Sequence, residues 1–149
     1  MESVLTGGCE CGRVRYQLSA KPVDPGYCHC STCQGVSGAP VLAYASVPIG
    51  AFTLTQGEPR RRRSSKFGER TFCSDCGTQL TMQVDHQPDT IDFTLASLDT
   101  PEAVAPEFHI WTRSRIEWFD IADDRPRYET SRPARRGRRL RCPFRPRPP

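Results

Sequence analysis

Clustered cysteines constrain this chain more than any other feature of its sequence. Seven of the eight fall into three tight groups, and the eighth stands alone: Cys9-x-Cys11, Cys28-x-Cys30-x-x-Cys33, Cys73-x-x-Cys76 and Cys142. Thiols stay free in a reducing compartment, where clusters of this kind are typical of metal sites or redox pairs. Spacing alone leaves four arrangements open: disulfides, a CxxC redox pair, a single zinc site with the other thiols free, and two zinc sites.

The two cysteine pairs are each suited to supply half of a four-thiol site. Gly77 follows Cys76 and can accept the positive φ of a tight turn that aims two sulfurs at one ion. Cys9 and Cys11 are two residues apart, so in an extended segment their sulfurs share a face. If both pairs share an ion, the site is closed and tetrahedral. A site of that kind is structural, since it has no open position for chemistry.

The third cluster supplies three thiols from six residues. Cys28 and Cys30 share a face by alternation, and the two residues that follow can turn the chain and bring Cys33 back. Three protein ligands leave a fourth position open to water or substrate, which is typical of catalytic zinc. A helical turn at 31–36 would also help to hold Cys33 as a thiolate. Alternation points His29 away from the ion, which favours a supporting role over ligation.

Short alternating segments predict a mainly β fold with antiparallel pairing. Apolar and polar residues alternate in 14–18, 80–84 and 91–95, and the segments 40–47 and 51–55 also have strand character. Residues 108–112 and 115–119 are predicted as a last strand pair. Among the residues after 100, Trp111, Trp118 and Phe119 are expected in the core. His109 is expected to be a packed or surface histidine, with proton transfer as the alternative. Asp85, Asp92 and Asp99 are spaced by seven, which three short repeated strands explain without a function.

Charge divides the chain into a body, 1–130, and a tail, 131–149. The tail contains eight Arg, five Pro and no acidic residue, which predicts a disordered extension. The body then carries thirteen basic and seventeen acidic residues, so its surface is not that of a nucleic-acid-binding domain. Contact with nucleic acid is expected only through the tail, if at all. The run Arg60 to Arg63 is expected on a solvated strand edge.

No targeting or membrane signal is evident in the sequence. No run approaches 18 apolar residues, and the segment MESVLTGGCECG lacks a basic stretch followed by an apolar one. We therefore expect a soluble, cytoplasmic protein of one domain.

Five strings of residues together resemble one enzyme family. They are GGCECGRVRYQL, CHCSTCQGVSGAP, FCSDCGTQL, LASLD and HIWTRSRIEW. Over roughly residues 4–130 the chain resembles the glutathione-dependent formaldehyde-activating enzymes, also called the CENP-V/GFA domain family. The resemblance implies small twisted antiparallel sheets around zinc, similar to the methionine sulfoxide reductase B fold. It also implies two zinc sites. Cys9, Cys11, Cys73 and Cys76 match the structural site, and Cys28, Cys30 and Cys33 match the catalytic site.

The resemblance further implies an activity. The family joins formaldehyde to glutathione and is classed with the carbon–sulfur lyases. We therefore expect a zinc-dependent enzyme that acts on a thiol adduct of a small aldehyde, with glutathione as co-substrate. The family often has basic residues directly after the third cysteine of the catalytic cluster, where this chain has Gln34 and Gly35. Two other readings stay open: a zinc-stabilised binding module whose basic tail contacts nucleic acid or an acidic partner, and a thiol redox protein. The sequence leaves open the aldehyde, the thiol, the oligomeric state and the roles of Cys142 and the tail.

Overall fold

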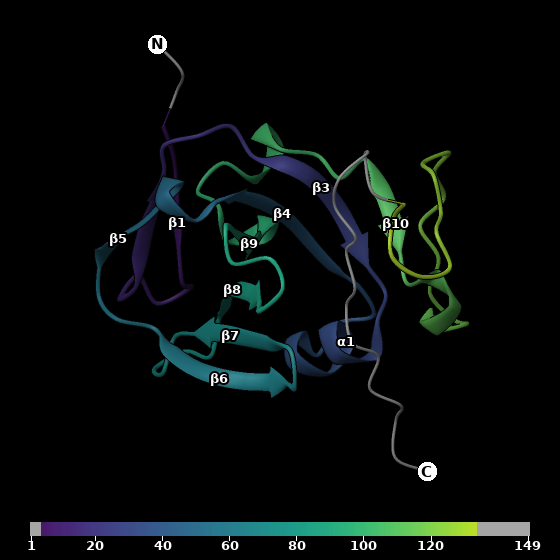
Figure 1. Cartoon of the computed structure of the whole chain (residues 1–149), viewed down its shortest axis with the longest axis horizontal. Coiled ribbons are helices and arrows are strands. Elements are labelled where there is room, and N and C mark those ends of the chain that lie inside the picture. Colours follow the sequence, from purple (N-terminus) through teal and green to yellow (C-terminus); the bar gives the residue numbers. More distant parts are fainter. Residues whose placement is uncertain (1–3, 134–149) are drawn as a thin grey trace.

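Ten short strands form two sheets in the computed structural model of the chain, which describes residues 4–133. The smaller sheet has the order β1-β2-β5, and the larger one has the order β10-β3-β4-β9-β8-β7-β6 (Figure 1). The strands are β1 Leu5–Gly8, β2 Arg15–Leu18, β3 Val23–Cys28, β4 Leu42–Pro48, β5 Phe52–Gln56, β6 Arg60–Ser65, β7 Gly68–Phe72, β8 Gln79–Val84, β9 Thr90–Thr94 and β10 Phe108–Ile110. The helices are α1 Ser31–Ser37 and four 3₁₀ turns, η1 Ile49–Ala51, η2 Leu95–Ser97, η3 Pro101–Ala103 and η4 Thr112–Ser114.

The predicted mainly β architecture is confirmed, with one exception in how the last strand pairs. All neighbouring strands run antiparallel except β10, which lies parallel to β3. The expected strand at 115–119 is wrong: that segment holds a turn, and the Trp118 side chain is 78% exposed instead of lying in the core. β10 instead bridges at His109 to Arg127, further along the chain.

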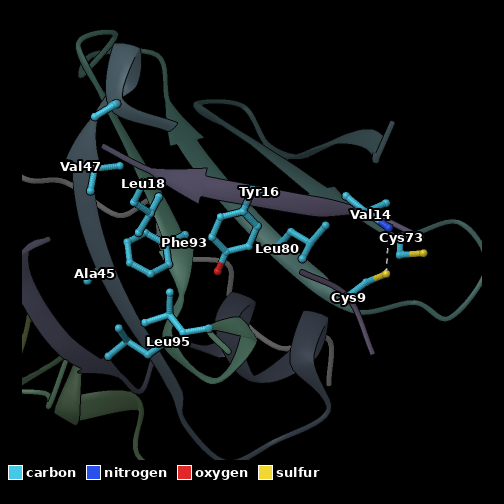
Figure 2. Close-up of a cluster of buried hydrophobic side chains, with 12 residues drawn as sticks. Cys9, Val14, Tyr16, Leu18, Ala45, Val47, Cys73, Leu80, Phe93 and Leu95 are labelled. Atoms are coloured by element: carbon cyan, nitrogen blue, oxygen red, sulfur yellow. Dashed lines mark hydrogen bonds between the residues drawn. The ribbon is translucent and has the colours of Figure 1, made fainter. Parts of the chain in front are cut away.

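Alternation along the strands builds the main core between the two sheets. Tyr16 and Leu18 of β2 and Phe93 of β9 are each 1% exposed. Figure 2 shows these side chains packed together, with Leu80 between them and the sulfurs of Cys9 and Cys73. The rings of Tyr16 and Phe93 lie 6.2 Å apart, in a tilted arrangement that aromatic pairs favour. The core therefore ends at a pair of cysteines.

The arginine run and the helix lie where the sequence places them. Arg60 to Arg63 fall on β6, the edge strand of the larger sheet, and all four are exposed. Helix α1 covers the predicted helical turn and is capped at its C-terminus by Gly38, which has a left-handed φ of 66°. Among residues 4–133, no helix has the length and apolar character needed to cross a membrane. Residues 134–149 of the predicted tail, with Cys142, lie outside the described residues.

Candidate metal centres

Four cysteines from two distant turns converge at one end of the core. The ligand atoms of Cys9, Cys11, Cys73 and Cys76, here called the four-thiol centre, all lie within 4.8 Å of one another. The Sγ atoms of Cys9 and Cys11 are 3.5 Å apart, and those of Cys11 and Cys73 are 3.8 Å apart. A tetrahedral zinc ion with Zn–S bonds of about 2.3 Å needs sulfurs about 3.8 Å apart. The spacing of these thiols fits such an ion.

Two similar turns hold these cysteines in place. The backbone N–H of Gly12 donates to the Cys9 carbonyl at 3.1 Å, and that of Gly77 donates to the Cys73 carbonyl at 2.9 Å. Both glycines have a φ close to +79°, which a side chain would strain, so the glycine expected after Cys76 is needed there. Thr78 joins the two turns, because its hydroxyl accepts the Glu10 N–H at 3.0 Å and lies 3.2 Å from the Cys76 sulfur.

The thiols of this centre cannot all ionise without a cation. Hydrogen bonds from the hydroxyl and backbone of Thr78 lower the pKa of Cys76 to about 6. A backbone hydrogen bond at Arg13 opposes the change at Cys11, but desolvation and the neighbouring thiols raise the pKa of Cys11 to about 12. Thiols that share protons in this way release them when a metal binds.

The remaining clustered cysteines form a three-thiol centre next to helix α1. Cys28 ends β3, Cys30 precedes the helix as its N-cap and Cys33 lies in its first turn. Their ligand atoms lie within 4.8 Å of one another, all three residues are buried, and no fourth His, Cys, Asp or Glu ligand joins them within the described part of the chain. The expected return of the chain to Cys33 is confirmed. The N–H of Cys33 donates to the Cys30 sulfur at 3.3 Å, so the helix terminus supports Cys30.

A buried arginine faces the three-thiol centre from another strand. Arg70 of β7 is 4% exposed, and its Nη2 donates to the Cys33 sulfur at 3.3 Å. Its Nε also donates to the Ser64 hydroxyl at 3.2 Å. A hydrogen bond with Cys28 opposes the change at Cys33, but the one with Cys30 and burial raise the pKa of Cys33 to about 11. Three thiolates and a divalent ion carry a net charge of −1, which the guanidinium would balance.

Behind the centre, two histidines and an aspartate form a hydrogen-bonded chain. His29 Nε2 lies 2.8 Å from His109 Nδ1, and His109 Nε2 lies 3.1 Å from both carboxylate oxygens of Asp123. Both histidines are fully buried, which confirms the supporting position expected for His29 and the packed one expected for His109. Burial and the charge of His109 lower the pKa of His29 to about 4. This hydrogen-bonded chain fixes the segment between Cys28 and Cys30.

A cavity of about 150 Å³ opens beside the three-thiol centre. Cys28 and Cys33 line it, together with Arg70, Trp111 and the cavity-facing side of β4, β8 and β9. Trp111 is 7% exposed, has a φ of 58° and has an indole N–H with no hydrogen-bond partner among the described residues. Ser131, Arg132 and Pro133 also line the cavity. The four-thiol centre does not contribute to this lining.

Comparison with known families agrees with the arrangement of the cysteines. Residues 4–114 match the family model described as glutathione-dependent formaldehyde-activating enzyme. This chain belongs to that family. The matched range contains both thiol centres, Arg70 and Trp111, and ends before Asp123.

The individual proteins that this chain resembles have low sequence identity to it. A Halomonas elongata protein named "Putative glutathione-dependent formaldehyde-activating enzyme" is 26% identical over 127 residues, covering 79% of this chain and 81% of the relative. A Schizosaccharomyces pombe protein named as an uncharacterized lyase is 28% identical over 74 residues, covering 50% of this chain and 53% of the relative. A crystal structure of a Rhodobacter sphaeroides protein superposes with a TM-score of 0.54 at 22% identity, covering 68% of this chain and 91% of that one. This last likeness concerns the fold alone.

Sequence reasoning missed three residues around the family's cysteine cluster. Arg70 lies in an unremarkable stretch, GERTF, seven residues after the end of a more conspicuous arginine run. Asp123 follows the segment that was expected to be a strand. Asp92 alternates with the apolar Ile91 and Phe93, which indicates a polar strand face. In the structure Asp92 lines the cavity.

Proposed function

We propose that this chain is a zinc-dependent carbon–sulfur lyase-type enzyme that acts on the glutathione adduct of formaldehyde, or on another thiol adduct of a small aldehyde. One observation carries the proposal: three buried thiols with no fourth protein ligand among residues 4–133 border a cavity. An open coordination position beside a cavity is what a metal-bound substrate needs. Family membership supports the choice of thiol and aldehyde.

The donor sets of the two centres fit different roles for zinc. Four thiols at tetrahedral spacing complete a closed structural site, so we assign Cys9, Cys11, Cys73 and Cys76 to it. Cys28, Cys30 and Cys33 would hold a second zinc ion with one position open. Bound there, zinc would keep the sulfur of a thiol substrate ionised at neutral pH, since a free thiol has a pKa of about 8.5.

The chain's own residues then orient the substrate. Arg70 balances the negative charge of the thiolates and fixes the position of Cys33. The chain of His29, His109 and Asp123 holds the segment between Cys28 and Cys30 from behind. Because three thiolates make an ion a weak Lewis acid, we assign the centre to binding and positioning the thiol, and not to strong polarisation of the aldehyde.

Calorimetric titration of glutathione into the zinc-loaded protein tests this function. We expect saturable binding of about one glutathione per chain. Binding should be lost in Cys30→Ala and retained in Cys142→Ala, which makes the same change but keeps all seven clustered thiols. Absence of binding to a protein with both zinc sites filled would show that membership of the family carries the fold here but not the substrate.

Cysteine clusters of the metal-binding kind are typical of reducing compartments, and this chain has two of them. On that basis we also propose a cytoplasmic location. Fractionation of cells that express the tagged protein tests this.

A further inference from the structure

Four side chains form a row across the cavity-facing side of the larger sheet. Strand register pairs Ser46 of β4 with Asp92 of β9, Asp92 with Met82 of β8, and Met82 with Arg70 of β7. Directly opposed residues project from the same face of a sheet, and all four of these line the cavity. With neighbouring strands about 4.8 Å apart, the backbones of Asp92 and Arg70 lie about 10 Å from one another, and both side chains line the same cavity.

The two charged members of this row have separate partners. Arg70 is engaged by the Cys33 sulfur and the Ser64 hydroxyl. Asp92 instead accepts a hydrogen bond on Oδ1 from the Ser46 hydroxyl at 2.5 Å. Its second oxygen, Oδ2, has no hydrogen-bond partner among residues 4–133. A half-buried carboxyl with one oxygen outside that hydrogen bond therefore lies in the cavity wall, as does the arginine that contacts the three-thiol centre.

The surroundings of Asp92 favour its protonated form. Burial and the charge of Cys33 outweigh the hydrogen bond from Ser46 and the charge of Arg70, and they raise the pKa of Asp92 to about 6. The other ionisable groups that face it are Asp24 of β3, which acts in the same direction, and Tyr44 of β4, whose own pKa burial raises well above the usual value. A carboxyl of this kind can give and take a proton near neutral pH.

We propose that Asp92 is the proton donor and acceptor for the substrate oxygen in this cavity, an inference that rests on the function proposed above. When the thiolate sulfur forms its bond to the aldehyde carbon, the C=O π electrons move to oxygen, and that oxygen takes the proton from Asp92. The carboxylate then takes a proton back from the solvent, into which the next thiol releases its own proton on binding. In the reverse direction the carboxylate removes the hydroxyl proton as the C–S bond breaks.

Exchange of ¹³C-formaldehyde with its glutathione adduct, followed by NMR on the zinc-loaded protein, tests this role. Asp92→Asn should lower the enzyme-catalysed exchange rate by at least about 100-fold at pH 6, the usual scale for loss of a general acid. Calorimetric binding of glutathione should be unchanged. Asp89→Asn removes an exposed acid three residues away and should stay within about twofold of the unchanged protein.

Two further measurements separate proton transfer from a structural role. The ¹³C resonance of the Asp92 carboxyl should titrate near pH 6, and the ratio of the rates of the unchanged protein and Asp92→Asn for adduct formation should fall as the pH rises through that value. Ser46→Ala removes a hydrogen bond that stabilises the carboxylate, so it should move both transitions to higher pH. This second variant decides the matter if Asp92→Asn loses zinc or fails to fold.

The possible failures are distinguishable. Unchanged exchange in a folded, zinc-loaded Asp92→Asn, or an ordinary pKa for Asp92, overturns the role of this residue and leaves the proposed function standing. Failure of the unchanged protein to bind glutathione or to accelerate exchange overturns both.

Discussion

The four-thiol and three-thiol centres are both built from cysteines, but their positions suit different roles, one in stability and one in ligand binding. The first joins two turns that lie more than sixty residues apart, at the end of the main core, with Cys11 exposed and no part in the cavity. The second takes its thiols from six consecutive residues, buries all of them and borders the cavity. A centre that closes a long loop stabilises the chain, whereas a local, incomplete one leaves a coordination position for a ligand.

Loss of one thiol at each centre gives the sharpest test of this comparison. Cys73→Ser should release one zinc ion per chain and lower the thermal midpoint by at least about 10 °C, because metal-linked folding free energy is lost. Cys30→Ser should keep the zinc of the four-thiol centre and melt within about 5 °C of the unchanged protein, yet lose glutathione binding. Metal analysis and thermal scans measure both. Equal losses of stability in the two variants would contradict the division of roles.

The hydrogen-bonded chain of His29, His109 and Asp123 should affect zinc binding at the three-thiol centre and not at the four-thiol centre. His109→Leu leaves the buried His29 Nε2 without its partner, while Asp123 keeps its ion pairs with Arg125 and Arg127, at a cost of about 1–3 kcal/mol in the free energy of unfolding. It should also weaken zinc binding at the three-thiol centre by about 10- to 100-fold, as loss of a supporting hydrogen bond does. His86→Leu changes an exposed histidine and serves as the control.

Competition with a chelator can resolve the two zinc affinities in each of these variants. Weakening of both centres to the same extent by His109→Leu would mean that the centres are not independent.

Close packing of β3 against β10 positions the three-thiol centre, and a glycine allows it. A Cβ added at Gly26 would lie 2.5 Å from the Phe108 ring, so Gly26→Ala should cost about 1–3 kcal/mol and lower glutathione affinity. Gly35→Ala is the matched change in α1, where a Cβ meets nothing within 4 Å. It should stabilise the protein by about 0.5–1 kcal/mol. Chemical denaturation measures both, and destabilisation by Gly35→Ala would argue against the helix as described.

Local rules predicted most of the fold and the grouping of the thiols within each cluster. Alternation located three of the ten strands, β2, β8 and β9, and strand character located β4, β5 and β10. The spacing of Cys28, Cys30 and Cys33 located a turn and a short helix. The failures concern long-range pairing. Nothing local in residues 115–119 says that β10 pairs in parallel with β3 and bridges to Arg127. Likewise, alternation puts Asp92 on a polar face but does not say whether that face meets solvent or a cavity.

In the cavity wall, unlike at the four-thiol end of the core, we expect a residue that increases activity to lower the free energy of unfolding. The pKa of Asp92 is about 6 in the folded chain and near 4 in an unfolded one, so the folded state binds more protons between these values. Stability should therefore fall as the pH rises from about 4 through 6. Asparagine does not titrate, so Asp92→Asn should gain on the order of 1 kcal/mol over the unchanged protein between pH 5 and pH 8.

Denaturant unfolding of both proteins at the two pH values measures this difference, and the pH dependence of zinc binding cancels in it. Conservative changes at the four-thiol end are expected only to destabilise. Asp92→Asn is expected to stabilise above pH 6 while it slows exchange, because a carboxyl held half-buried for chemistry is costly to fold. A pH-independent difference between the two proteins would mean that Asp92 is as well solvated as a surface acid, and the cavity would then differ from the other end of the core only in shape.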